Sequence, residues 1–198
     1  MTARDEILAR VRSALATADR SVPRKVPVRP GASTTTAGSP DRFVERVSEY
    51  GATVVRCAAA DVELTLAATL GGRTVVVPPG LAWNVRGAVS DRGQGGLELD
   101  RVEAVVTTAS LGIAETGTLV LQHGPGQGRR ALSLVPDLHV CVVRADQIVV
   151  GVREALAALD PLAPQTWISG PSATSDIELS RVEGVHGPRT LHVVLVSD

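Results

Sequence analysis

Four segments of the chain hold side chains that could bind or transform a small anion. They are residues 107–118, 124–130, 169–178 and 184–189. Carboxylates and imidazoles can transfer protons, whereas guanidinium groups, hydroxyls and backbone amides bind carboxylates and phosphates. Each segment also has a purely structural interpretation, which is weighed beside the chemical one below.

Glu115 stands alone among small and apolar residues in the first segment. Burial raises the pKa of a carboxyl group and suits it to acid–base or nucleophilic work. The alternative is a carboxylate that bonds to backbone amides of its own turn. We take Glu115 as a candidate catalytic residue, and Thr107 and Thr116 as candidate ligand-binding residues.

The second segment combines glycines with two arginines. Gly124, Gly126 and Gly128 alternate along the chain and precede Arg129 and Arg130. Backbone amides of such a loop can form an anion-binding nest, and the arginines could close over a carboxylate or phosphate. The pattern is neither the Rossmann fingerprint nor a Walker loop. The candidate ligand contacts are Gly126, Gly128, Arg129 and Arg130, and a hairpin tip with solvated arginines is the alternative.

The third segment is rich in hydroxyls and precedes an expected helix over residues 175–182. A helix start offers free amides and a dipole that favours an anion. Ordinary capping by Thr174 or Ser175 is the alternative. The candidate ligand-binding residues are Ser172, Thr174, Ser175 and Asp176.

His186 lies in the fourth segment, in a turn before the last expected strand. Because an imidazole titrates near neutral pH, His186 is a candidate general base or ligand donor. A turn histidine that bonds a carbonyl or faces water is the alternative. The other histidines, His123, His139 and His192, show no metal-ligand spacing, so no metal site is predicted.

Alternating strand and helix patterns must position these segments. The expected strands are residues 53–57, 74–77, 104–107, 117–121, 139–143, 166–169 and 191–196, and the expected helices are residues 41–50, 61–70, 146–159 and 175–182. This order predicts a three-layer α/β/α fold with a mostly parallel sheet of about six or seven strands. Ligands of such sheets bind outside the carboxyl ends of the strands. We therefore expect Glu115, the glycine-rich loop and residues 172–176 to meet in one cleft there.

The chain divides into three parts. Residues 1–19 have the spacing of a short amphipathic helix, and residues 20–39 form a linker rich in proline, glycine, serine and threonine. Residues 40–198 form the α/β domain. Where the first helix docks is left open by the sequence.

Composition excludes several function classes. Among 198 residues, 20 basic and 21 acidic side chains give a net charge of -1, which argues against a dedicated binder of nucleic acid or anionic membranes. Cys57 and Cys141 are the only cysteines, so the chain itself offers no iron–sulfur or structural zinc cluster. With no targeting or membrane-spanning stretch, we expect a cytoplasmic protein.

The four segments together resemble the lactate-utilisation protein C family, the LUD-domain proteins. The resemblance rests on GIAETGTLVL at 112–121, GPGQGRRALSL at 124–134, ISGPSATSDIEL at 168–179 and GVHGPRTLHV at 184–193. It implies a fold similar to the ribose-phosphate isomerase, glucosamine-phosphate deaminase and CoA-transferase group. It also implies a bacterial system that oxidises L-lactate to pyruvate, in which partner subunits carry the iron–sulfur clusters.

Three functions remain open at this point. The first is a non-redox subunit of that system, which binds a small carboxylate or docks the iron–sulfur partners. The second is a free-standing isomerase- or CoA-transferase-like enzyme that uses Glu115. The third is a pure interaction scaffold. The resemblance supplies no catalytic residues, so the candidate site rests on the positions of its residues alone.

Overall fold

The computed structural model describes residues 2–17, 37–174, 182–183 and 186–197, and its contacts divide the chain into units of residues 1–32 and 33–198. The first unit contains α1 (Ala3–Leu15). A capping box between Thr2 and Asp5 fixes its start, since each side chain accepts a hydrogen bond from the other's backbone N–H. None of the α1 residues is buried.

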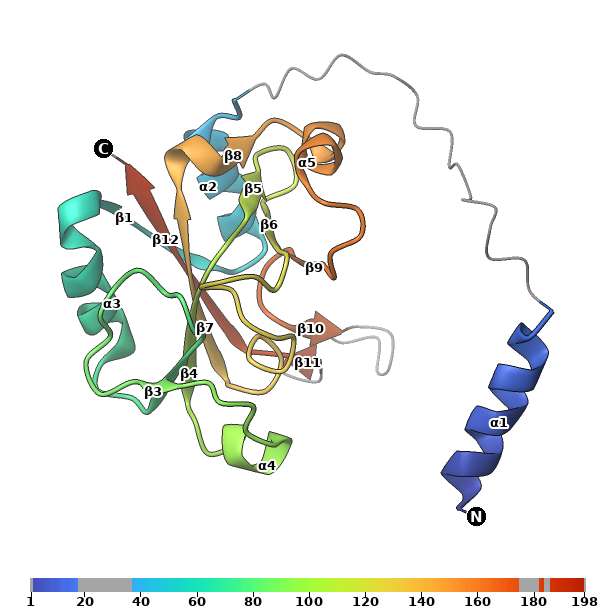
Figure 1. Cartoon of the computed structure of the whole chain (residues 1–198). Helices are drawn as coiled ribbons and strands as arrows, with labels where there is room; N and C mark the ends of the chain where they lie inside the picture. Colours follow the sequence, from blue (N-terminus) through green and yellow to red (C-terminus); the bar gives the residue numbers. More distant parts are fainter. Residues whose placement is uncertain (1, 18–36, 175–181, 184–185, 198) are drawn as a thin grey trace. The chain divides into compact units, whose positions relative to one another are not determined.

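The second unit is built on a six-stranded parallel sheet (Figure 1). Its strands, in spatial order, are β1 (Thr53–Ala58), β12 (Thr190–Ser197), β7 (Leu138–Arg144), β4 (Ala104–Thr108), β2 (Val75–Val77) and β3 (Val89–Ser90). Every pairing between these neighbours is parallel. The predicted mixed α/β fold with a mostly parallel sheet is confirmed.

Helix α3 (Val62–Leu70) covers one face of this sheet. Its buried residues Val62, Leu66 and Leu70 are four apart, which places them on one side of the helix. They pack against alternate residues of the strands, including Val140 and Val194. An aliphatic core therefore forms without any aromatic side chain among its fully buried residues.

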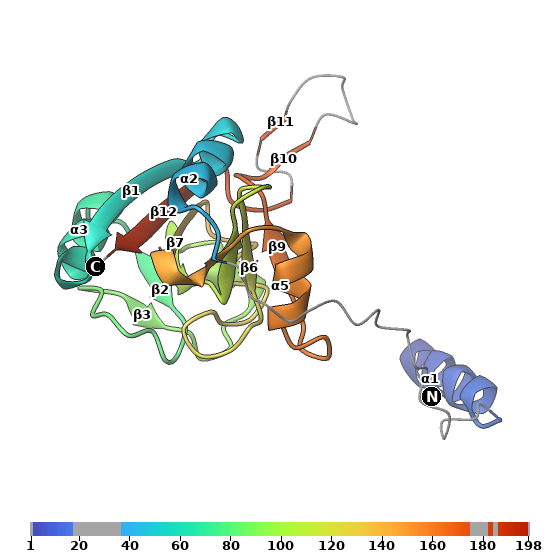
Figure 2. The same cartoon turned by 90° about the horizontal axis from the view of Figure 1, so that it is seen from above.

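The opposite face is covered by α2 (Pro40–Glu49) and by a second, smaller sheet (Figure 2). The order in this sheet is β8 (Ile148–Val149), β5 (Leu111–Ile113), β6 (Thr118–Leu121) and β9 (Thr166–Ile168). Helix α5 (Val152–Ala158) packs on the small sheet through Ala155. The second outer layer of the predicted three-layer fold is thus a helix and a sheet, not helices alone.

The predicted helix over residues 146–159 is wrong in its first six residues. The chain instead forms η2 (Ala145–Gln147) and β8, and α5 begins only after Gly151, whose backbone is extended. Ile148 and Val149 are β-branched, and they pair with β5 instead of continuing a helix. Two other short elements, η1 (Ala59–Asp61) and α4 (Gly96–Leu99), are absent from the prediction.

The predicted helix over residues 175–182 lies outside the described residues except for Val182. That residue belongs to β11 (Val182–Glu183), which pairs antiparallel with β10 (Ala173–Thr174). Most of the predicted linker also lies outside the described residues. Its end does not, since Gly38 donates its N–H to the Ile148 carbonyl at 2.8 Å and Ala37 bridges to Val149. Within the described parts of the chain, no helix has the length and apolar character needed to span a membrane.

Candidate functional site

A pocket of about 210 Å³ lies on the sheet face opposite α3, and we call it the Arg130 pocket. Its lining comes from the starts of β7 and β12, from β9 and the turn after it, and from two loops. The lining residues are Arg130, Ser133, His139, Thr166, Trp167, Ile168, Ser169, Gly170, Pro171, Ser172, Ala173, His186, Gly187, Pro188 and Leu191. Arg130, Ser172 and His186, candidates from three different segments, thus share one pocket.

The Arg130 pocket does not lie where the strand pattern predicts. His139 and Leu191 are the second residues of β7 and β12, so the pocket is near the amino ends of these strands. The prediction of a cleft at the carboxyl ends is wrong for this pocket. The reason is that β9, which the turn at Ser169 follows, pairs antiparallel with β6 in the small sheet and is not a strand of the parallel sheet.

Hydrogen bonds fix the two loops that border the pocket. The Ser172 N–H donates to the Pro188 carbonyl at 2.8 Å, and the His186 N–H donates to Ser172 Oγ at 3.2 Å. On the β9 side, Ser169 Oγ lies 2.8 Å from Thr118 Oγ1, which is 2.7 Å from Thr116 Oγ1. Thr116 therefore does not line the pocket, and it is connected to the lining residue Ser169 only through the hydroxyl of Thr118.

Arg130 supplies the positive charge of the pocket. Its Nη1 donates to the Ser133 carbonyl at 3.1 Å and to Ser133 Oγ at 3.0 Å. Ser133 is buried, and both bonds fix the direction of the guanidinium group. Arg130 is itself exposed, so its other N–H groups can meet a ligand carboxylate.

His139 is a buried member of the pocket that the sequence analysis missed. Its ring is 1% exposed, and Nε2 lies 2.7 Å from Thr107 Oγ1. Burial, together with the nearby charge of Arg130, lowers the pKa of His139 to about 4, so the ring is neutral at pH 7. A histidine inside an otherwise apolar strand was the available signal, because polar side chains seldom lie there without a partner.

Thr107 and Cys141 continue this buried polar cluster. Thr107 is fully buried and cannot touch a ligand directly, although it is a candidate ligand-binding residue. Its Oγ1 lies 3.6 Å from Cys141 Sγ, and burial raises the pKa of the Cys141 thiol to about 12. The structure thus places Thr107 behind His139.

Glu115 lies apart from the Arg130 pocket. It occupies the exposed turn between β5 and β6, and its N–H donates to the Val150 carbonyl at 3.0 Å. A Cβ added to Gly151 would come 2.7 Å from Glu115 Oε2, so the carboxylate sits against the start of α5. The expectation that Glu115 faces the same cleft as residues 172–176 is wrong, because Glu115 lies against Val150 and Gly151 before α5 and does not line the Arg130 pocket.

Arg129 and the glycine-rich loop also serve the fold. Arg129 forms a bidentate pair with Asp91, with Nε and Nη2 donating at 2.9 and 3.0 Å. The guanidinium group that was expected to bind a ligand carboxylate therefore binds a carboxylate of the protein itself. The Gly126 N–H donates to the Pro79 carbonyl at 2.8 Å, and the Gly128 N–H donates to the Gly124 carbonyl at 3.1 Å. These amides are therefore not an open anion nest.

The remaining candidates lie at or beyond the edge of what the structure describes. The backbone of Thr174 is in β10, whereas Ser175 and Asp176 lie outside the described residues. Among the described residues, no group of three His, Cys, Asp or Glu side chains could hold a metal ion. Cys57 and Cys141 pack in different core clusters, Cys57 on the α3 face and Cys141 on the other.

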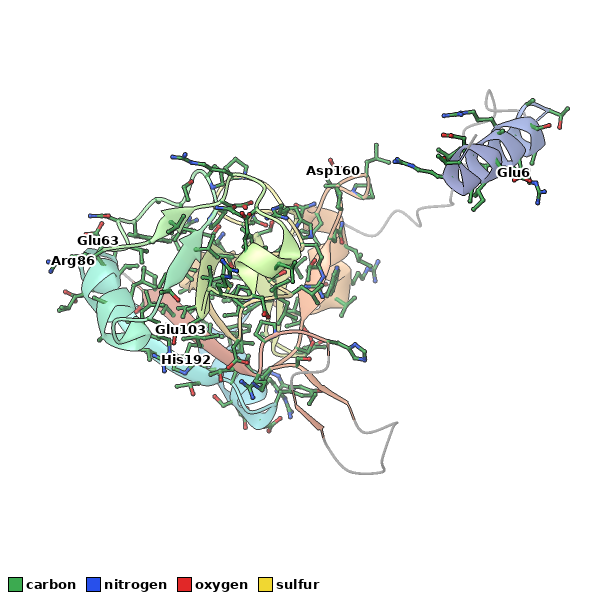
Figure 3. The ribbon with its side chains drawn as sticks, turned by 90° about the horizontal axis from the view of Figure 1, so that it is seen from below. Glu6, Glu63, Arg86, Glu103, Asp160 and His192 are labelled. Carbon is green, nitrogen blue, oxygen red and sulfur yellow. The ribbon has the colours of Figure 1, made fainter. Side chains whose placement is uncertain are left out.

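A second cavity of about 630 Å³ lies at the amino edge of the main sheet, and its lining includes Glu103 and His192, which are labelled in Figure 3. Three of its charged side chains already have partners within the protein. Glu103 accepts from the Thr74 N–H at 2.9 Å, and Arg189 pairs with Asp137 at 2.6 Å. Because Arg189, the cation best placed to bind an anion here, is already paired with Asp137, this cavity is a weaker candidate than the Arg130 pocket.

The fold and the site together define a class: an α/β domain with a parallel sheet and a small pocket that combines a cation, an imidazole and several hydroxyls. Residues 41–196 match the family model described as LUD domain. The chain therefore belongs to the LUD domain family.

Several proteins are similar to this chain. "Lactate utilization protein C" of Deinococcus radiodurans is 49% identical in an alignment of 165 residues that covers 78% of each chain. "Lactate utilization protein C" of Geobacillus sp. is 32% identical over 126 residues, covering 58% of this chain and 52% of that relative. A crystal structure of a DUF162 family protein from Deinococcus radiodurans has a TM-score of 0.68 and 39% identity, over 79% of this chain and 95% of that one.

Proposed function

We propose that the chain is a non-redox subunit of a bacterial L-lactate utilisation system and that its Arg130 pocket binds a small carboxylate. The observation that carries this proposal is the chemistry of the pocket, where Arg130 faces a neutral imidazole and serine hydroxyls. A volume of about 210 Å³ suits a metabolite of a few heavy atoms. The names of the relatives favour lactate as that metabolite, and pyruvate is the product of its oxidation.

The oxidation of lactate needs a place for two electrons, which protein side chains of this kind do not supply. The chain has only two cysteines, and they lie in separate core clusters. We assign the electron carriers to iron–sulfur partner subunits, which this chain would serve by holding a ligand or by docking.

An enzyme that uses Glu115 as its nucleophile or base is less well supported. Glu115 is exposed and does not line the Arg130 pocket, so it cannot act on a ligand held there by Arg130. His186 is the remaining candidate for acid–base work in the pocket. A pure scaffold would need neither residue.

Ligand binding tests the proposal directly. Titration calorimetry with L-lactate and pyruvate should detect binding to the wild type, and Arg130→Ala should weaken it about 10- to 150-fold, the effect of losing a charge-assisted hydrogen bond of about 1.5 to 3 kcal/mol. Arg153→Ala, at an exposed arginine outside the pocket, is the matched control and should bind as the wild type does. A wild-type protein that binds no small carboxylate would favour the scaffold.

Growth tests the role in the cell. Deletion of the gene from its host should abolish growth on L-lactate as sole carbon source while leaving growth on pyruvate intact. The wild-type gene should restore growth, and the Arg130→Ala gene should restore it poorly. Undiminished growth of the deletion strain on L-lactate would contradict the proposed role.

A further inference from the structure

The ring of His139 connects the buried interior to the Arg130 pocket. On its inner side, Nε2 lies 2.7 Å from the hydroxyl of the fully buried Thr107. The ring also lines the pocket. Among the described residues, Nδ1 makes no hydrogen bond. It is also absent from the fully buried side-chain atoms that lack a partner, so Nδ1 is not sealed from solvent. Nδ1 is therefore the ring nitrogen available to a ligand.

The surroundings of Thr107 decide which ring nitrogen carries the proton. Thr107 has one hydroxyl proton and two neighbours that could accept it, His139 Nε2 at 2.7 Å and Cys141 Sγ at 3.6 Å. An imidazole nitrogen is a good acceptor, whereas sulfur is a weak one. Thr107 thus donates to Nε2, and a neutral ring then carries its proton on Nδ1.

The ring stays neutral because its burial and the charge of Arg130 both oppose a second proton. The pocket therefore presents two kinds of donor side by side, the guanidinium N–H groups of Arg130 and the Nδ1–H of His139. The nearby serine oxygens are partly engaged: Ser133 accepts from Arg130, and Ser172 Oγ accepts from the His186 N–H.

We propose that His139 determines specificity in the Arg130 pocket, its Nδ1–H binding the oxygen next to the ligand's carboxylate, so that the pocket prefers 2-oxo acids to 2-hydroxy acids. This inference rests on the proposed function of the pocket. A keto oxygen only accepts and matches a fixed donor. A hydroxyl can accept the same bond, but its own proton then needs an acceptor, and Ser133 Oγ and Ser172 Oγ each have one of their two acceptor positions already occupied. Such a pocket holds the oxidised product of a lactate-oxidising system more tightly than its substrate.

The tautomer of His139 can be measured without any ligand. A long-range ¹H–¹⁵N spectrum of the full chain with ¹⁵N-labelled histidine should show the proton of His139 on Nδ1, with the signal assigned by its loss in His139→Gln. Cys141→Ala should leave the tautomer unchanged, because Thr107 does not need the sulfur as its acceptor. A proton on Nε2 in the wild type would overturn the inference.

Binding measurements test the preference itself. The wild type should bind pyruvate about three- to tenfold more tightly than L-lactate, as expected for one neutral hydrogen bond. His139→Gln should bring this ratio close to one, because a glutamine amide can present either a donor or an acceptor. Acetate, which has no oxygen at the neighbouring carbon, should bind wild type and His139→Gln equally.

The outcomes separate the two proposals. If neither pyruvate nor L-lactate binds to the wild type, the proposed function fails and the inference falls with it. If both bind with equal affinity, or if His139→Gln keeps the wild-type ratio, only the role of His139 is contradicted. Should His139→Gln fold poorly by its melting temperature, the wild-type tautomer and the wild-type ratio still decide the question.

Discussion

Thr107, His139 and Cys141 place three polar side chains in a sheet face that is otherwise aliphatic. A buried polar group without a partner costs about 1–3 kcal/mol, so these residues stabilise the fold only as a connected cluster. The short contact between Thr107 and His139 satisfies the inner side of the ring. Because His139 also lines the Arg130 pocket, a change in this cluster should affect both the pocket and the stability of the sheet.

Acid should destabilise the protein through His139. The unfolded chain takes up a proton near pH 6.5, whereas the folded ring does so only near its pKa of about 4. The unfolded state therefore binds more protons between these values, and the free energy of unfolding should fall by about 3 kcal/mol as the pH drops from 6.5 to 4, then level off. Urea denaturation of the wild type at several pH values measures this fall.

His139→Gln provides the comparison for that experiment. Burial also lowers the pKa of His192, so part of the pH dependence belongs to another residue. The difference between wild type and variant isolates His139, and the variant's curve should be flatter in this range. Parallel curves for the two proteins would contradict the assignment.

Arg129 should matter for stability and not for ligand binding. Its side-chain bond holds the pKa of the Asp91 carboxyl below the usual value, and the Asp91 side chain is 8% exposed. Arg129→Ala leaves Asp91 without its partner and should lower the free energy of unfolding by about 1–2 kcal/mol, allowing for the solvent that reaches Arg129. Arg101→Ala, at an exposed arginine, should change it by less than about 0.5 kcal/mol.

Calorimetry on the same variants completes the comparison. Carboxylate affinity should stay within twofold of the wild type in Arg129→Ala but fall in Arg130→Ala. An Arg129→Ala protein with full stability and weakened binding would reverse the roles that the structure gives to these neighbours.

The candidate site was predictable from residue types only in part. Arg130, Ser172 and His186 lie in motifs with recognisable donors, and the structure brings them to one pocket. Arg129 is chemically identical to Arg130, and its contacts with Asp91 and Gln94, far away in sequence, direct it elsewhere. The orientation of the His139 ring depends in the same way on Thr107, which lies on the adjacent strand β4. Such pairings follow from sheet register, which the local sequence does not specify.

At the scale of elements, the turn between β5 and β6 packs closely on α2. Gly117 has a φ of 58°, and a Cβ there would come 2.5 Å from Val47 N and 2.6 Å from the Arg46 carbonyl carbon. Gly117→Ala should therefore lower the free energy of unfolding by about 3 kcal/mol, through the left-handed backbone and the collision together. Chemical denaturation measures this loss.

Gly124→Ala is the matched control for Gly117→Ala. An added Cβ at Gly124 meets no atom within 4 Å, and its φ lies outside the left-handed range. This variant should stay within about 0.5 kcal/mol of the wild type. If both variants lost the same free energy of unfolding, the close packing of the turn on α2 would not be the reason for glycine at position 117.

The long elements were predictable, and the short ones were not. Residues 53–57, 104–107 and 191–196 consist of β-branched and apolar residues apart from Arg56 and His192, and each run lies within a strand of the main sheet. Strand β5 has three residues with Gly112 at its centre, so it gives almost no local signal. Its formation depends on pairing with β6 and β8, which is tertiary information.

At the scale of the whole molecule, α1 should be dispensable for folding of the α/β unit. All described residues of α1 are exposed or nearly so, and the unit of residues 33–198 contains the complete main sheet. A chain that begins at Ser33 should melt within about 2 °C of the full chain, because the four clusters of buried core residues all lie within residues 33–198. Differential scanning calorimetry compares the two, and a drop of 10 °C would reveal a stabilising role for α1.

The position of β12 affects how the protein is made. β12 lies between β1 and β7 in the main sheet, although it is the last of these strands along the chain. β1 pairs with β12 alone, so it leaves the ribosome well before its partner exists. At ordinary rates of synthesis the delay is on the order of ten seconds. Throughout that interval β1 has unpaired backbone on both sides, and a nascent chain of this topology is a natural client for chaperones that bind exposed strands.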